Sequence, residues 1–350
     1  MKSWIQKLGL AGCAFGVGFV PQLADADAVA DFYKGKTITM VVAYNTGGGY
    51  DTYARLVARY WPEHIPGKPN MVVQNMPGAD GHIGANYVAK VAAKDGTAIG
   101  MISGEVAARP LLRPGAAKFK GSDFAWIGSP NGTTGVCVSW HTAPVKTIED
   151  AKKTEVVVGA ASGANSNTYT YARIVKDTLG VKFKIVAGYA GTNGLIQAMQ
   201  NGEIQAFCGN VLDAISARNP EWIKDRTVNV LVQLALHKNP RLPPEDPLIM
   251  DLVKGTKYYD ILNVLVGSQS ELGRPFLAPA GVPQDRLAAL RDSFAATMNS
   301  DGFRAQAKKM NLDVDPVSGK ELQAFADKLY ALPPDVIQQA RRFLGEEGKK

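Results

Sequence analysis

The sequence predicts an α/β fold made of two units, each built around a largely parallel β-sheet. The chain has 350 residues, of which 46% are hydrophobic and 20% charged, enough for about two domains with a core each. β-Branched runs alternate with stretches of helical periodicity, which is typical of sheets covered by helices. The same composition excludes a disordered chain and a disulfide-rich miniprotein.

The first unit opens with a strand, a glycine-rich loop and a helix. Residues 37–42 form a β-branched run that predicts a buried strand. The loop at 45–49 ends in successive glycines, and a helix is expected from about Asp51. Four positions of that helix share one face: Ala54, Val57, Ala58 and Trp61.

The same order repeats directly downstream. A strand at 71–73 leads into a loop at 75–81, and the next helix places on one face Ala85, Val88, Ala89 and Ala92. A third strand is expected at 97–102. Because parallel strands end at the same edge of a sheet, the loops of this unit are predicted to gather there.

A second unit is predicted to begin near Val136. It has expected strands at 156–158, 183–187, 204–208 and 228–234, and helices around 171–175 and 195–199. The proline-rich segment 239–247 is predicted to be a loop. Two helical faces follow in the tail, the first after Pro283 in a first-turn position: Leu287, Leu290, Phe294 and Met298, then Leu322, Phe325 and Leu329.

The amino terminus has the features of a secretory signal. Lys2 and Lys7 precede an apolar stretch at 8–20, which is shorter than the roughly 20 residues that span a bilayer. A small-residue run follows, so residues 1–26 are predicted to be a signal peptide cleaved after Ala26 or Ala28. Lipoprotein processing at Cys13 is the less favoured alternative, since it leaves a very short apolar core.

Removal of that signal leaves two cysteines, Cys137 and Cys208. They can pair in the oxidising compartment to which the signal leads, or remain as two buried thiols. Their spacing in the sequence does not distinguish the two outcomes.

Motifs of catalysis and metal binding are absent from the sequence. It contains no G-x-S-x-G, H-E-x-x-H or C-x-x-C, and its four histidines lack ligand spacing. Gly35-Lys36-Thr37 precedes a strand, so it is not the end of a phosphate-binding loop. The net charge of +7 is spread along the chain, which argues against nucleic-acid binding and mildly favours acidic small ligands. No cofactor or metal is predicted.

Three loops of similar composition indicate a ligand site. Each follows a strand, is rich in small residues and opens a helix, at 45–49, 75–81 and 159–166. Helix amino termini present N–H groups and partial positive charge, so such loops bind carboxylates or phosphates. For a single loop of this kind, a tight turn that binds nothing is the better explanation. Two on one sheet and a third in the second unit favour an anion site.

Two of these segments resemble a known family. YNTGGGYDTYAR at 44–55 and NMPGADGHIGAN at 75–86 resemble the loop-helix signatures of the substrate-binding proteins of tripartite tricarboxylate transporters, the Bug family. The segments 188–192 and 278–283 continue the similarity, which runs from about Phe32 to the end of the chain.

The resemblance implies a type II periplasmic-binding-protein fold, with two α/β lobes and a ligand cleft between them. Domain 1 is expected at 27–130 and 268–350, and domain 2 at 131–267. The implied function is that of a monomeric periplasmic receptor that captures a di-, tri- or aromatic carboxylate and delivers it to membrane transporter subunits. Two alternatives stay open: a ligand-sensing partner of a signalling protein, and a secreted hydrolase or lyase.

The resemblance also implies ligand-binding residues from both domains. From domain 1 these are Tyr44, Asn45, Thr46, Gly47, Gly48, Gly49, Asp51, Pro77, Gly78, Ala79, Asp80 and Ser103. From domain 2 they are Ser162, Asn165, Ser166, Tyr189, Gly191, Thr192 and Asn210. Asp80 stands where many relatives have a glycine. The absence of an acid at 208–210 argues against an amino acid ligand.

Three charged residues have roles that the sequence leaves open. Asp51 is expected to cap the helix that it opens. Glu105 lies at the predicted cleft edge, where solvated, hydrogen-bonding and catalytic roles are all possible. Arg274 is expected near the crossover between the lobes, either to meet a second acidic group of the ligand or as a surface arginine at the hinge.

Overall fold

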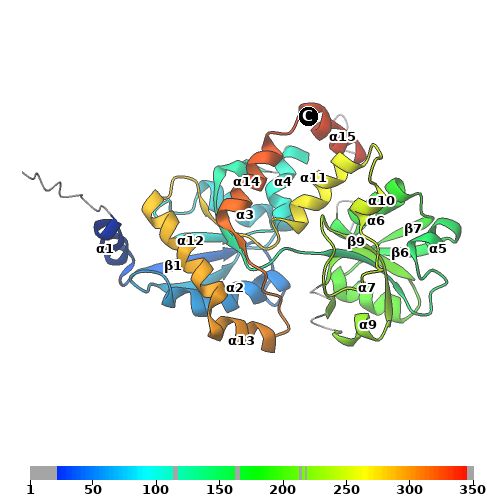
Figure 1. The fold of residues 1–350 in the computed structure, drawn as a ribbon, viewed down its shortest axis with the longest axis horizontal. Helices are drawn as coiled ribbons and strands as arrows, with labels where there is room; N and C mark the ends of the chain where they lie inside the picture. Colours follow the sequence, from blue (N-terminus) through cyan, green and yellow to red (C-terminus); the bar gives the residue numbers. More distant parts are fainter. Residues whose placement is uncertain (1–21, 113–116, 162–165, 213–214, 217–218, 345–350) are drawn as a thin grey trace, which may run out of the picture.

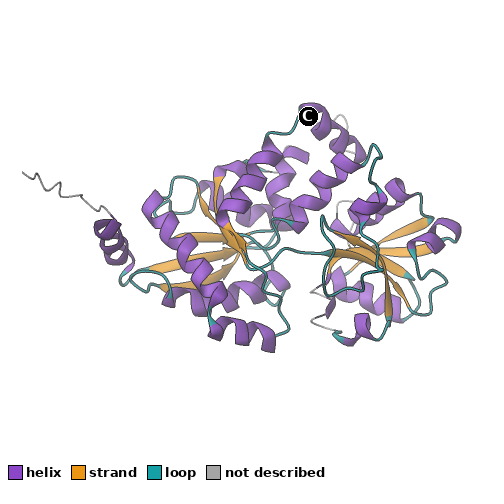
Figure 2. Cartoon of the chain, in the orientation of Figure 1, coloured by secondary structure: helices purple, strands orange, loops and turns teal. Residues whose placement is uncertain are grey.

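The computed structural model describes residues 22–112, 117–161, 166–212, 215–216 and 219–344. Two α/β bodies lie side by side, each with its own sheet, and a group of helices lies above the junction between them (Figure 1, Figure 2). Most of the predicted signal sequence, residues 1–21, lies outside the described part of the chain.

The first sheet has six strands in the order β11-β4-β10-β3-β1-β2. β1 pairs in parallel with both β2 and β3, whereas β10 runs antiparallel between β3 and β4. The sheet therefore combines strands from both ends of the chain: β1 (Thr37–Val42), β2 (Asn70–Asn75), β3 (Ala98–Met101), β4 (Phe124–Ser129), β10 (Phe276–Pro279) and β11 (Val317–Ser318).

Helices on this sheet bury the faces that the periodicity predicts. α2 buries Ala54 and Val57, and Trp61 beyond it packs edge-on against Phe276 and Phe294, with ring centroids 5.8 and 5.2 Å apart. The elements of this body are α1 (Gln22–Tyr33), α2 (Gly49–Tyr60), η1 (Trp61–Glu63), η2 (Ala79–Gly81), α3 (His82–Lys90), η3 (Gly121–Asp123), α12 (Gln284–Asn299) and α13 (Asp301–Lys309).

The second sheet has five strands in the order β7-β6-β8-β5-β9. β6 pairs in parallel with β7 and β8, and β5 runs antiparallel to β8 and β9. The strands are β5 (Gly135–Trp140), β6 (Val156–Ala161), β7 (Phe183–Tyr189), β8 (Ala206–Val211) and β9 (Val228–Leu234). Around them lie α5 (Ile148–Lys153), α6 (Asn167–Leu179), α7 (Gly191–Gln200), α9 (Glu221–Lys224) and α10 (Ile249–Leu252).

Four helices lie above the junction between the two bodies (Figure 1): α4 (Gly104–Leu112), α11 (Tyr259–Ser270), α14 (Gly319–Tyr330) and α15 (Pro334–Phe343). Residues of α4, α11 and α15 share one buried cluster with strands of the second sheet, for example Ala108, Leu265 and Ala340. α14 instead packs through Leu322 against β4 of the first sheet. The domain limits at 130/131 and 267/268 stay predictions.

Two chain segments cross from one body to the other and run side by side. Thr133 donates from its backbone N–H to the Ser270 carbonyl at 3.1 Å and from Oγ1 to the Gln269 carbonyl at 2.8 Å. The Arg274 N–H donates to Ser129 Oγ at 3.0 Å. Gly273, at φ +57°, lies so close to Asn131 that a Cβ there would be 2.1 Å from the Asn131 carbonyl oxygen. We call residues 129–134 and 268–274 the crossing segments.

A disulfide joins Cys137 on β5 to Cys208 on the neighbouring strand β8, with the Cα atoms 4.0 Å apart. Both cysteines are fully buried. The sequence leaves open whether the two cysteines pair or stay as free thiols, and the structure shows that they pair. Such a bond is stable in an oxidising compartment.

Across the described residues, every helix is too short or too polar to cross a membrane. The same residues bring together no group of three or more His, Cys, Asp or Glu side chains suited to a metal ion.

Candidate ligand site

The loops that follow β1, β2 and β3 begin at the same level of the first sheet. In the parallel pairings, Val42 lies opposite both Asn75 and Met101, the last residues of β2 and β3. Two further hydrogen bonds continue the ladder past the strand ends, from Met76 N–H to the Val42 carbonyl at 2.7 Å and from Ala43 N–H to the Met101 carbonyl at 3.1 Å. The predicted gathering of the loops at one edge is therefore confirmed.

The first loop is open to solvent and leads into the amino terminus of α2. Asn45, Thr46, Gly47 and Gly49 are exposed, and Tyr44 stacks on Tyr50 with ring centroids 4.5 Å apart. α2 begins at Gly49 with Gly48 as its N-cap, and a glycine has no side chain with which to cap the first-turn amides. Gly47 has φ +80°, which favours glycine at this turn.

Asp51 shapes this loop from inside the helix. It is the third residue of α2, so the expectation that it is the N-cap is wrong. Its buried carboxylate accepts hydrogen bonds from Gly47 N–H at 2.8 Å, Arg55 Nε at 2.9 Å and Asn75 Nδ2 at 2.9 Å. Burial alone would raise the pKa of Asp51, but the bonds from Arg55, Gly47 and Asn75 together lower it. A direct contact of Asp51 with a ligand stays a prediction.

The second loop is tied to the first through Asn75, whose Nδ2 also donates to the Tyr44 carbonyl at 3.0 Å. Within the loop, Gly78 and Ala79 have φ of 128° and 45°, and Gly81, at φ 89°, is the N-cap of α3. Pro77 and Ala79 are exposed and Gly78 is half-buried. The backbone of Asp80 lies in η2, and its side chain is outside the described residues.

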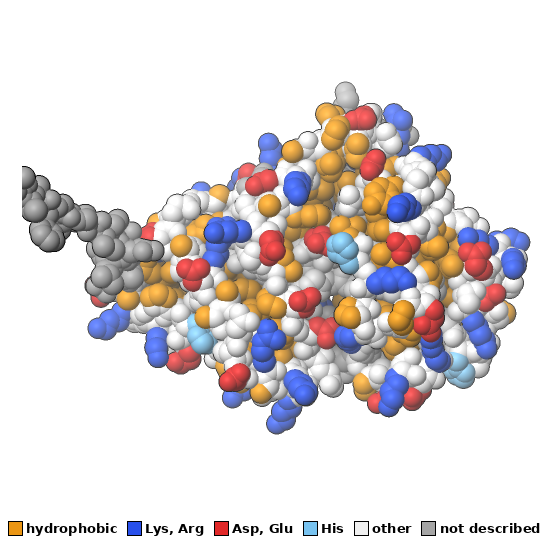
Figure 3. Space-filling model, viewed as in Figure 1, with side chains coloured by type: hydrophobic (Ala, Val, Ile, Leu, Met, Phe, Trp, Pro, Cys, Tyr) orange, Lys and Arg blue, Asp and Glu red, His pale blue; other side chains and the backbone are white. Residues whose placement is uncertain are grey.

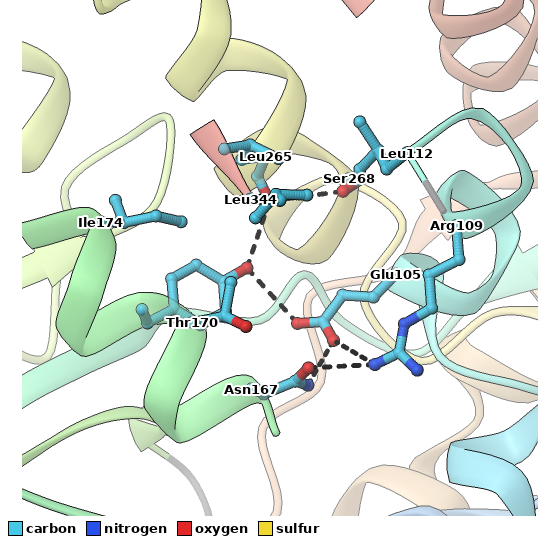
Figure 4. Close-up of a pocket in the computed structure, with 10 residues that line it drawn as sticks. Glu105, Arg109, Leu112, Asn167, Thr170, Ile174, Leu265, Ser268 and Leu344 are labelled. Carbon is cyan, nitrogen blue, oxygen red and sulfur yellow. Dashed lines mark hydrogen bonds and ion pairs between the residues drawn. The ribbon is translucent and has the colours of Figure 1, made fainter. Parts of the chain in front are cut away.

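The third strand leads into a polar cluster that links the two bodies (Figure 4). Ser103 is buried beyond β3, and Glu105 follows in the first turn of α4. Glu105 accepts a hydrogen bond from Asn167 Nδ2 and one of 3.3 Å from the Tyr171 hydroxyl, both on α6. Arg109 Nη2 lies 3.1 Å from Asn167 Oδ1 and 3.9 Å from Glu105 Oε2. The structure therefore gives Glu105 a hydrogen-bonding role.

The Tyr171 hydroxyl keeps its proton at ordinary pH and is one of the donors in this cluster. Its burial, and then the neighbouring Glu105 carboxylate, raise the pKa of its hydroxyl well above the usual value. The adjoining cavity measures about 50 Å³ and is lined in part by Thr170, Leu265 and Leu344. This volume holds a few water molecules. The cavity is therefore too small for a dicarboxylate.

The loops of the second body also share one edge of their sheet. Ala161, the last residue of β6, pairs with Tyr189 at the end of β7, and Gly191 opens α7 directly afterwards. Ser166 caps α6 by accepting from Tyr169 N–H at 3.3 Å. Tyr189 and Thr192 are half-buried. Ser162 and Asn165 lie outside the described residues, as does the side chain of Asn210 on β8.

Arg274 is buried rather than on the surface. Only 3% of it is exposed, so the interpretation as a surface arginine at the hinge is wrong. Its Nη1 donates to Asn131 Oδ1 at 3.1 Å, and its guanidinium carbon lies 4.6 Å from the ring centroid of Tyr53. Asn131 Nδ2 in turn donates to the Tyr53 hydroxyl at 3.1 Å.

The structure brings the expected residues together within each body. It joins the bodies at Glu105 and α6, and charged side chains of both signs lie along the junction on the face shown in Figure 3. That the first loop and residues 189–192 close on the same molecule stays a prediction. Sequence reasoning missed Arg55, Asn75, Asn131, Asn167 and Tyr171. Of these, only Arg55 had a signal, its i,i+4 spacing from Asp51.

A family model and two relatives match this chain. Residues 54–340 match the family model described as "Tripartite tricarboxylate transporter family receptor". A UPF0065 protein of Agrobacterium vitis is 29% identical over 54% of this chain and 54% of its own length. The chain thus aligns with about half the length of that relative. A UPF0065 protein of Cupriavidus necator is 22% identical over 97% of both chains.

Solved structures share the fold. A TctC solute-binding protein from Polaromonas superposes with a TM-score of 0.65 at 20% identity, over 88% of this chain and 99% of that one. MatC from Rhodopseudomonas palustris, with bound malate, superposes with a TM-score of 0.62 at 19% identity, over 88% of this chain and 99% of that one. A second R. palustris protein, with adipate, superposes with a TM-score of 0.62 at 20% identity, over 89% of this chain and 97% of that one.

These superpositions confirm the predicted two-lobed α/β fold of a solute-binding protein. The family model covers more than half of the chain. The chain therefore belongs to the family of tripartite tricarboxylate transporter receptors.

Proposed function

We propose that this protein binds a small organic carboxylate between its lobes and delivers it to the membrane subunits of a tripartite transporter. One observation carries the proposal: two glycine-containing loops lie at one sheet edge, and each opens a helix without a capping side chain. Residues 45–47 and 49 of the first loop and residues 77 and 79 of the second are exposed. Helix amino termini of this kind attract anions through N–H groups and the helix dipole.

A dicarboxylate is the first ligand class to test. The fold is shared with proteins whose structures contain malate and adipate, and both are dicarboxylates. Each hydrogen bond from an N–H group to a charged oxygen contributes about 1.5–3 kcal/mol, offset by desolvation and by ordering of the lobes.

Two features of the chain support a periplasmic location for the proposed receptor. The buried Cys137–Cys208 disulfide is compatible with an oxidising compartment, and the predicted signal peptide directs export. In the periplasm, a receptor of this family acts as a carrier between free ligand and the transporter. It needs no catalytic group, and we propose that the ligand leaves chemically unchanged.

Thermal unfolding with a panel of acids tests the proposal. Malate, succinate, adipate, citrate and benzoate are added separately, with succinamide as the neutral control. A bound acid at 100 times its dissociation constant stabilises the folded state by about 2.7 kcal/mol, and succinamide leaves the melting temperature unchanged. A panel without any effect on melting contradicts carboxylate binding.

Two further measurements separate the alternatives. NMR of the ligand after prolonged incubation with the protein shows an unchanged spectrum for a receptor and new resonances for a hydrolase or lyase. Capture of solubilised membrane proteins on the immobilised receptor, with and without ligand, recovers transporter subunits. Recovery of a signalling receptor instead favours the sensing role.

A further inference from the structure

An ion pair joins the two bodies next to the crossing segments. Arg241 lies in the loop that follows β9 of the second body, and its Nη1 pairs with the carboxylate of Asp313 in the first body. Asp313 lies in the loop between α13 and β11. The two side chains are 36% and 33% exposed. We call this ion pair the interlobe bridge.

In the order of the strands, the interlobe bridge and the Glu105 cluster lie on opposite sides of the crossing segments. These segments connect to β4 and β10, which lie between β3 and β11 in the first sheet, and to β5, which lies between β8 and β9 in the second. Glu105 follows β3 and contacts α6, the helix after β6. The interlobe bridge instead joins the loops next to β9 and β11. The bodies are therefore in contact on both sides of the segments that join them.

Hydrogen bonds fix each partner of the interlobe bridge to its own body. Asn239 Oδ1 accepts from the Arg241 backbone N–H at 2.9 Å, and Asn239 Nδ2 donates to Thr134 Oγ1 at 3.0 Å. The Asp313 carbonyl accepts from the Tyr53 hydroxyl at 3.0 Å. Tyr53 lies on α2, the helix that the first glycine loop opens. The interlobe bridge thus links the second body to a helix of the proposed ligand site.

A cavity of about 510 Å³ adjoins the interlobe bridge. Its lining comes from both bodies and both crossing segments, and includes Thr133, His237, Ser270 and Asp315. The two bodies are therefore not closely packed at this place, and the partners of the bridge can separate without disrupting a packed core. A partly exposed ion pair of this kind changes an equilibrium by only about two- to fivefold, so the bridge biases the lobes without locking them.

We infer that the Arg241–Asp313 bridge holds the two lobes in the arrangement described here and separates when a ligand enters or leaves the cleft. This inference rests on the proposed function and adds to it the control of ligand release. A rotation of the lobes about the crossing segments changes the distance between the bodies on either side of these segments, so it breaks contacts such as this bridge. The bridge therefore keeps the lobes together without ligand and slows the release of a bound one.

Energy transfer between two dyes tests the inference in the absence of a ligand. The dyes are attached to cysteines that replace the exposed residues His64 of the first body and Glu155 of the second, with Cys13 replaced by serine. Asp313→Arg brings two cations together and raises the share of molecules with altered transfer efficiency at least about fivefold. The charge swap R241D/D313R returns this share to within about twofold of the wild-type value.

The matched control reverses a charge within one body. Asp177 pairs with Arg173 at 3.3 Å, and both side chains are partly exposed, at 40% and 41%, but the pair lies within α6. Asp177→Arg changes the distribution by less than about twofold. If circular dichroism shows that D313R does not fold, Asp313→Asn takes its place. A folded variant with the wild-type distribution, or a shift that the charge swap does not restore, overturns the inference.

Stopped-flow measurement of ligand release completes the test. Malate, succinate and adipate are each displaced from the loaded protein by dilution, and D313R should release the bound acid at least about threefold faster than wild type and D177R do. Equal release from D313R and wild type shows that the interlobe bridge does not control release. If wild type binds none of the three acids, the proposed function is wrong, while the energy-transfer experiment still decides whether the bridge holds the lobes.

Discussion

The carboxylate of Asp51 accepts a hydrogen bond from the backbone N–H of Gly47 at 2.8 Å, so a helix residue fixes the glycine loop that precedes it. The same carboxylate is held by Arg55 and by Asn75, which lies at the end of the neighbouring strand. Two of the three candidate loops are therefore positioned by one buried acid. Such support lowers the entropy that the loops lose when a ligand orders them.

Replacement of Asp51 should weaken ligand binding through the two loops that its carboxylate positions. Asp51→Asn removes the charge and places an amide donor among three donors. We expect about tenfold weaker dicarboxylate binding and a loss of about 1–3 kcal/mol in the free energy of unfolding. Calorimetry and urea unfolding measure the two effects. Asp177→Asn, in the exposed pair with Arg173 at 3.3 Å, is the control and should change stability by no more than about 0.5 kcal/mol.

The pH dependence of stability provides a second test of Asp51. Burial opposes ionisation, but hydrogen bonds from Arg55, Gly47 and Asn75 lower the folded-state pKa below the ordinary carboxyl value of about 4. A group with a depressed folded pKa contributes stability above its unfolded pKa and loses it as the pH falls through the folded pKa. The difference in unfolding free energy between wild type and D51N should therefore be constant near neutral pH and shrink below about pH 4. A constant difference down to about pH 2 would contradict an ionised Asp51.

The sequence predicted the sheets and loops better than the contacts between lobes. The strand at 228–234 agrees with β9 at both ends, and α2 begins two residues before the expected Asp51. These elements have local signals, namely β-branched runs and glycines before an amphipathic face. α11 was missed because almost all of its residues from Ile261 to Ser270 are buried, so that it lacks the polar face by which periodicity reveals a helix.

The residues of the candidate site likewise fall into a group that the sequence predicted and a group that it did not. The glycine loops have a local sequence signature, but the partners of Glu105 lie 62 and 66 positions away on α6. Arg274 and Asn131 are 143 positions apart and meet only because the two crossing segments run side by side. Such contacts are set by the packing of the two bodies, which local patterns do not encode.

The link between Glu105 and Tyr171 should appear as a coupling energy. In a double-mutant cycle of Glu105→Gln and Tyr171→Phe, we expect the two losses of unfolding free energy to differ from additivity by more than about 0.5 kcal/mol. The reason is that their hydrogen bond of 3.3 Å joins buried groups on α4 and α6. Urea unfolding measures the cycle. Glu149→Gln, in a surface pair with Lys152, serves as the control and should be additive with Y171F.

The disulfide should stabilise the second body strongly, because it closes a long loop. Cys137 and Cys208 are 71 positions apart, and the loop-entropy relation gives about 4 kcal/mol for a cross-link of this span. Wild type should melt at a lower temperature under reducing conditions. Double replacement of both cysteines by alanine should lower the melting temperature by a similar amount and make it insensitive to reductant. Equal melting of oxidised and reduced wild type, with reduction verified by thiol alkylation and mass spectrometry, would show that the bond between β5 and β8 adds no stability.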